Sequence, residues 1–144
     1  MADENAMPDG HVVALDVAES EFLRFTEAMD LDLDPKHWDA EDKKSFDDSK
    51  GKFLRAIQRG HLAVDEHGQP VFTPQLEPKT PITFYEPDGA CIMAVDLAKK
   101  NHDAAKTFKV LAAMTKQPEG TFAKMKNRDL KICQAVLGLF LGSG

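Results

Sequence analysis

The stretch that decides the fold is RDLKICQAVLGLFLG, residues 128–142. It begins with polar side chains and becomes almost continuously apolar from Ala135 to Leu141, where only Gly138 interrupts the run. A helix at a protein surface keeps polar residues on one face along its whole length, whereas this one loses them after Gln134. The run is too short for a membrane span, which needs roughly 20 apolar residues. The sequence therefore predicts a helix that must be covered, either by the protein's own core or by a partner.

The composition is that of a globular protein. A chain of 144 residues is large enough for one domain with a sizeable core. Its hydrophobic content of 42% and charged content of 29% are ordinary. Residues 1–10 have neither the basic nor the apolar region of a secretory signal, so we expect a cytoplasmic protein. Cys91 and Cys133 lie in apolar surroundings without CxxC spacing, which favours free buried thiols.

The charge is unevenly distributed along the chain. Residues 1–96 carry 9 Lys and Arg against 21 Asp and Glu, a balance of −12, and residues 97–144 carry 9 against 3, a balance of +6. Either the basic helices pack beside acidic elements, or they present a basic face to an acidic partner. The basic part disfavours nucleic acid as that partner, because its aromatic residues occupy core-like positions: Phe108, Phe122 and Phe140.

Residues 15–73 predict an N-terminal helical module with a hairpin, preceded by a disordered segment at residues 1–14. Asp16 and Glu19 have the spacing of a capping box, which predicts a helix to about Met29. A second helix starts at Asp39 and runs to about residue 59, and residues 61–65 and 70–73 form the hairpin. The expected buried positions are Ala18, Phe22, Phe25 and Met29 in the first helix, and Phe46, Phe53, Leu54 and Ile57 in the second.

Two features carry the residue types of metal sites. Residues 30–41 have alternating carboxylates that resemble an EF-hand calcium loop, but Pro35 stands where the sharp turn of such a loop needs glycine. His61 and His67 lie beside carboxylates in the predicted hairpin, yet no other cluster completes a set of ligands. We therefore expect neither a metal nor a cofactor.

Residues 74–81, PQLEPKTP, form a proline-rich connector to a second module at residues 82–142. Residues 82–85 and 90–95 predict a second hairpin around the turn at residues 87–89, Pro-Asp-Gly. A helix from Asn101 and the final helix follow. About four helices and two short hairpins predict an α+β fold, and the two modules are compatible with one domain.

The motifs of the common enzyme classes are missing. The chain has no GxSxG, HExxH, P-loop or GxGxxG sequence, and neither cysteine has a histidine near it in the sequence. These absences favour a protein that is not an enzyme. A small enzyme whose catalytic residues come together only in the folded chain stays an alternative.

Three segments of the second module form a series: PITFYEPDG at residues 81–89, KVLAAMT at 109–115, and a final helix that opens with RDL at 128–130 and ends with LFLG at 139–142. In this order and in these strings, residues 78–142 resemble the tail assembly chaperones of long-tailed bacteriophages. The resemblance implies a non-enzymatic phage or prophage protein in the cytoplasm of a bacterial host cell. Such a protein binds helical segments of the tape-measure protein and helps to recruit the tail-tube protein. A structural tail or head-tail joining component is the alternative from the same setting.

A chaperone for amphipathic helices needs an apolar surface with charged margins. The final helix offers both, and the alternative is that its apolar side chains lie in the core. Nearby elements have enough apolar surface for one of its faces, which leaves the other for a partner, a second copy or the N-terminal module. The sequence leaves homo-oligomerisation open and excludes a membrane span. The expected partner-binding residues are Lys131, Val136, Leu137, Leu139, Phe140 and Leu141.

Overall fold

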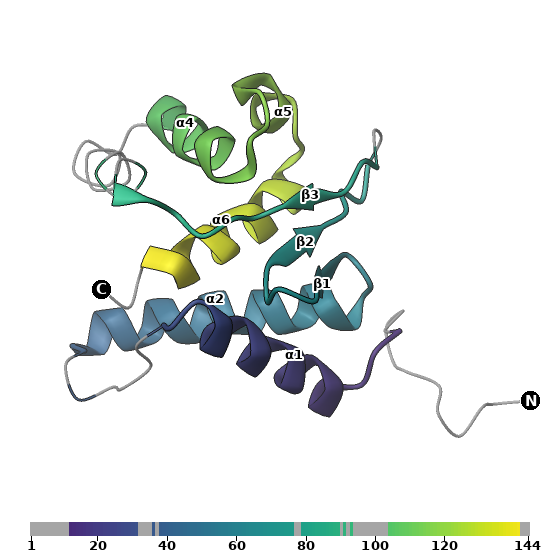
Figure 1. The fold of residues 1–144 in the computed structure, drawn as a ribbon, viewed down its shortest axis with the longest axis vertical. Coiled ribbons are helices and arrows are strands. Elements are labelled where there is room, and N and C mark those ends of the chain that lie inside the picture. The colour runs from purple at the N-terminus through teal and green to yellow at the C-terminus, as the bar shows by residue number, and fades with distance from the viewer. Residues whose placement is uncertain are drawn as a thin grey trace, which may run out of the picture.

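The computed structural model describes residues 12–31, 36, 38–76, 79–89, 91, 93 and 104–141. Within these residues the fold has five helices and a three-stranded antiparallel sheet, so the predicted α+β class is confirmed (Figure 1). The short α5 is the helix beyond the four expected. The helices are α1 (Leu15–Ala28), α2 (Ala40–Gln58), α4 (Ala104–Thr115), α5 (Glu119–Ala123) and α6 (Asn127–Leu141), and the strands are β1 (Leu62–Val64), β2 (Pro70–Phe72) and β3 (Ile82–Thr83).

Helix α1 begins one residue before Asp16, and no side chain caps it. The predicted capping box is therefore wrong, since Asp16 lies inside the first turn. The backbone amides of Val12 and Val13 both donate to the Gln58 carbonyl oxygen, at 2.5 and 3.1 Å. The prediction of disorder through residue 14 is thus wrong for Val12 and Val13, because the end of α2 holds them. Residues 1–11 lie outside the described part of the chain. The predicted buried stripe of α1 is confirmed at Ala18, Phe22, Phe25 and Met29.

Helix α2 has the boundaries that its end residues predict. The Asp39 carboxylate caps it by accepting from the Asp42 amide at 2.7 Å. Gly60 follows its last turn with φ of +81°, a conformation that glycine adopts without strain. The predicted inner face is confirmed: Phe53 and Ile57 are buried, and Phe46 and Leu54 pack against the core.

The sheet is a meander in the order β1-β2-β3. The first hairpin is confirmed, with Phe72 of β2 opposite Leu62 of β1. The second is wrong, because residues 89, 91 and 93 are helical and Ile82 of β3 pairs with Phe72 of β2 instead. Residues 91 and 93 are helical, and the Asp88 carboxylate accepts from the residue 91 amide at 2.9 Å. An aspartate before glycine serves as a helix cap as well as a turn residue, so the Pro-Asp-Gly pattern predicted a hairpin turn where a helical segment begins. The rest of the expected strand lies outside the described residues.

One hydrophobic core unites the two modules that the sequence separates. The Phe25 ring stacks on Phe53 at 5.0 Å between centroids and meets Phe140 of α6 edge-on at 5.2 Å. Helix α6 packs mainly on α2 and runs through the middle of the molecule in Figure 1, with α4 and α5 on its other side. A Cβ atom on Gly138 would lie 3.1 Å from the Ser49 hydroxyl oxygen. The glycine in the apolar run therefore allows α6 to approach α2 closely.

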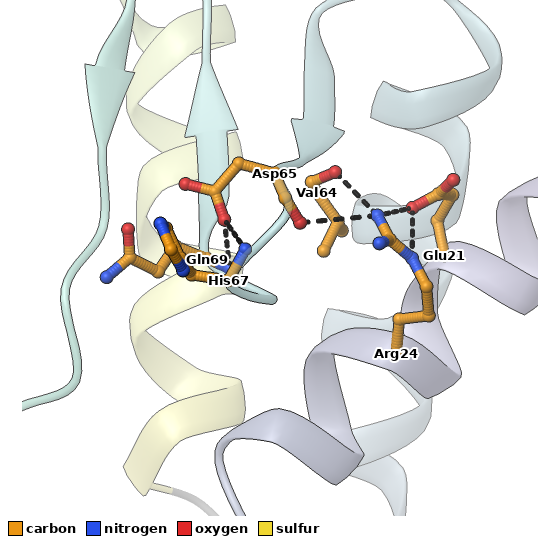
Figure 2. Close-up of polar contacts among 6 residues, drawn as sticks. All are labelled: Glu21, Arg24, Val64, Asp65, His67 and Gln69. Atoms are coloured by element: carbon orange, nitrogen blue, oxygen red, sulfur yellow. Dashed lines mark hydrogen bonds and ion pairs between the residues drawn. The ribbon is translucent and has the colours of Figure 1, made fainter.

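A single arginine joins α1 to the first hairpin (Figure 2). The Arg24 guanidinium donates to the carbonyl oxygens of Val64 at 2.7 Å and Asp65 at 3.3 Å. It also pairs with Glu21 one turn earlier, at 2.6 Å. The hairpin is thus fixed to α1 through its backbone.

The turn of this hairpin is held by its own aspartate. The Asp65 carboxylate accepts from the backbone amides of His67 at 2.9 Å and Gln69 at 2.8 Å (Figure 2). Gly68 has φ of +77°, and a Cβ atom on it would overlap the Cβ of Ala28 in α1. Glycine is needed here for both its conformation and its lack of a side chain.

Candidate protein-binding groove

The apolar side chains expected to bind a partner lie inside the fold. Val136 and Leu139 are 0% and 2% exposed, and Leu137 and Phe140 are each 8% exposed. Of the covers that the sequence left open, the N-terminal helices occupy this face. Helix α2 packs along α6, and the Phe25 ring of α1 meets Phe140, so these four side chains are not accessible to a partner in this fold. Lys131 is exposed, and the side chain of Leu141 lies outside the described part.

A groove opens instead beside the first turn of α6. It has a volume of about 550 Å³, within the range of roughly 300 to 1,000 Å³ found for ligand pockets. One wall is the connector that follows β2, and the other is formed by the turns that join α4, α5 and α6. The lining residues are Pro74, Leu76, Thr80, Ile82, Gln117, Pro118, Gly120, Thr121, Lys124, Met125, Lys126 and Asp129.

The wall between α4 and α5 is set by a sharp reversal of the chain. Lys116 takes a left-handed conformation, with φ of +58°, directly after α4. The Gln117 amide then donates back to the Ala112 carbonyl oxygen at 3.1 Å. Pro118 is the N-cap residue of α5, and the fully buried Phe122 anchors that short helix in the core. This wall is thus fixed by backbone geometry and by one aromatic side chain.

The connector wall is held to α6 by a buried carboxylate. Asp129 is 1% exposed, and its Oδ1 accepts from the Gln75 amide at 2.9 Å. Its place in the first turn of α6 also puts its negative charge near the positive end of the helix dipole. The segment predicted as a module boundary is therefore a structural wall.

Burial lowers the pKa of the nearby His61 imidazole below its ordinary value of 6.5, and the negative charge of Asp129 opposes that shift. Desolvation is the larger effect, so the folded chain favours the neutral imidazole.

The groove combines an apolar lining with a basic edge. Among the lining residues, Pro74 and Ile82 are buried and Leu76 is 39% exposed. Lys124 and Lys126 are exposed, and neither forms an ion pair with another described residue. Such a surface favours a ligand with apolar side chains and nearby carboxylates.

The described residues offer no site for metal or thiol chemistry. Among them, no three histidine, cysteine or acidic side chains are placed to share a metal ion. Residues 32–35 and 37 of the calcium-loop-like stretch lie outside the described part. Burial, aided by the charge of Asp129, raises the pKa of the Cys133 thiol far above its usual range, and burial also raises that of Cys91. A protonated, buried thiol is a poor nucleophile. No helix in the described ranges is both long and apolar enough to cross a membrane.

Comparisons with protein-family models, with curated proteins and with solved structures find no match for this chain.

Sequence patterns identify only part of the groove. The sequence indicates a binding role for Lys124, Met125 and Lys126 only because they precede the apolar run of the final helix. Leu76 gives a weak signal as the apolar residue of a polar, proline-rich connector. Nothing in the sequence shows that this connector lies opposite residues 117–126, since that pairing depends on the bond between Gln75 and Asp129.

Proposed function

We propose that the protein is a non-enzymatic assembly chaperone that holds an apolar, acid-flanked segment of a partner protein in the groove. The observation that carries this proposal is the apolar lining beside Lys124 and Lys126, which pair with no acidic side chain among the described residues. This is the arrangement by which grooves take up one face of an amphipathic helix. Carboxylates on the partner helix would lie beside the lysines and set its direction.

The resemblance to tail assembly chaperones gives the partner class to be tested first. It covers residues 78–142, and the groove draws most of its lining from that part of the chain. The proposed partner is a helical segment of a phage or prophage tape-measure protein, in the cytoplasm of the bacterial host. The tail-tube protein is the second partner that the resemblance implies.

The size of the groove limits the affinity of each contact. A groove of about 550 Å³ accepts a few side chains, and burying one Leu- or Phe-sized side chain contributes about 1.5–3 kcal/mol. Two or three anchors thus provide about 3–9 kcal/mol before the cost of association. We expect micromolar or weaker binding per segment, which suits a chaperone that must release its client.

Calorimetric titration of the full chain with helical tape-measure fragments from the same genome tests the proposal. A variant with Lys124→Glu and Lys126→Glu should bind at least about tenfold more weakly, a loss of about 1.4 kcal/mol. Lys131→Glu is the matched control, because Lys131 is exposed on α6 but does not line the groove. Equal affinity of a folded groove variant and the wild type would overturn the proposal. Recovery of the protein from purified virions would identify a structural component instead of a chaperone.

A further inference from the structure

Helix α1 exposes apolar side chains on the face that points away from the core. Leu15 and Leu23 are 50% and 53% exposed, and Val12, just before the helix, is 68% exposed. Leu15, Glu19 and Leu23 follow one another at intervals of four residues, so they line one face of the helix. Single exposed apolar residues are common, but here Leu15 and Leu23 share a face, with Glu19 between them.

Carboxylates lie between and beside these leucines. Glu19 stands between Leu15 and Leu23, and Asp16 and Glu27 lie next to them; all three are exposed, and none forms an ion pair with a described residue. The outer face of α1 therefore combines two exposed leucines with carboxylates that pair with no cationic side chain in the described part of the chain. This is the chemistry that the groove, with its apolar lining and lysine edge, favours.

A chain cannot place its own α1 in its own groove. In Figure 1, α1 and α5 lie at opposite ends of the long axis of the molecule, with α2 and α6 between them. We propose that the outer face of α1 in one copy docks in the groove of a second copy. Leu15 and Leu23 enter the apolar part of the groove, and the carboxylates of α1 lie beside Lys124 and Lys126.

Such a contact joins two different surfaces, so it is head-to-tail. A head-to-tail contact leaves one free groove and one free α1 on every dimer, and growth continues until a ring closes. The charges across the contact are exposed, so salt weakens it. Self-association and client binding use the same groove, so this contact rests on the proposed function. A second copy would occupy the groove until a client displaces it.

Sedimentation velocity of the full-length protein tests this inference with two variants. The groove variant carries Lys124→Glu and Lys126→Glu, and the helix variant carries Leu15→Lys and Leu23→Lys. The wild type should form oligomers that grow with concentration and dissociate at high salt, and each variant alone should be monomeric. An equal mixture should form a dimer that grows no further, because it restores one groove and one helix face. Val17→Lys is the control, since Val17 is 48% exposed on another face of α1.

Two results would overturn the inference. One is a wild type that stays monomeric at low salt and high concentration, and the other is a mixture of folded variants that remains monomeric. Client binding separates this inference from the proposed function. The helix variant should keep full affinity for the tape-measure fragment, whereas the groove variant should lose both interactions. Loss of client binding alone, or of self-association alone, in the groove variant would show that the two do not share the groove.

Discussion

Replacing Phe140 by alanine removes the ring through which α6 meets α1. Phe140 is 8% exposed, and its ring lies 5.2 Å from that of Phe25 in an edge-to-face arrangement. Truncation of a buried phenylalanine to alanine costs about 3–5 kcal/mol, and an aromatic pair contributes about 0.5–1.5 kcal/mol beyond the area it buries. A domain of this size has a free energy of unfolding of about 5–15 kcal/mol. The Phe140→Ala variant should therefore fold, with much of its stability lost.

Urea unfolding followed by circular dichroism measures this loss. With a slope of about 2 kcal/mol per molar urea, a loss of about 4 kcal/mol lowers the midpoint by about 2 M. Val17→Ala is the control, because Val17 is 48% exposed and such a surface change shifts stability by about 0.5 kcal/mol or less. A double-mutant cycle between Phe25→Leu and Phe140→Leu should give a coupling of about 0.5–1.5 kcal/mol. A loss below about 1 kcal/mol for Phe140→Ala would refute the packing of α6 in the core.

Three further changes test the elements around the core and the groove. Gly68→Ala should lower the melting temperature, because φ of +77° costs a non-glycine residue about 1–2 kcal/mol and the added methyl group overlaps α1. Gly89→Ala is the control and should leave the melting temperature unchanged, because nothing lies within 4 Å of a Cβ atom at that position. Asp129→Ala should lower the free energy of unfolding by about 1–3 kcal/mol and speed hydrogen exchange at the Gln75 amide, which loses its acceptor. An unchanged exchange rate would show that Asp129 does not hold the connector against α6. The pKa of His61 is lowered in the folded chain, so the unfolded chain binds more protons and stability falls as the pH drops below 6.5. His61→Gln should reduce this fall in thermal melts, and identical pH profiles of the variant and the wild type would contradict the role of His61.

Local patterns located both helices and the hairpin in the first half of the fold, although the capping box at Asp16 was wrong. The spacing of Ala18, Phe22, Phe25 and Met29 locates the inner face of α1, and Asp39 and Gly60 mark the ends of α2. These signals work because helix periodicity and caps depend on residues close together in the chain. The α+β class follows from the same kind of signal.

Long-range pairing explains where the sequence misled. The turn at Asp88 has the composition of both a hairpin and a helix start; in the fold β3 pairs with β2, and Asp88 accepts a hydrogen bond at the start of a helical segment. The apolar run of α6 shows that it is covered, but its cover, Phe25 and α2, lies about a hundred residues earlier. The groove depends on the same kind of distant contact, between Gln75 and Asp129.

In the proposed complex, a client occupies the groove while α6 stays in the core. Hydrogen exchange of the full chain, with and without a tape-measure helix, measures both parts of this arrangement at once. We expect slower exchange on binding at residues 74–76 and 117–126, with unchanged protection from Val136 to Phe140. Faster exchange from Val136 to Phe140, without protection of the groove walls, would show that the client displaces α2 and binds the apolar face of α6.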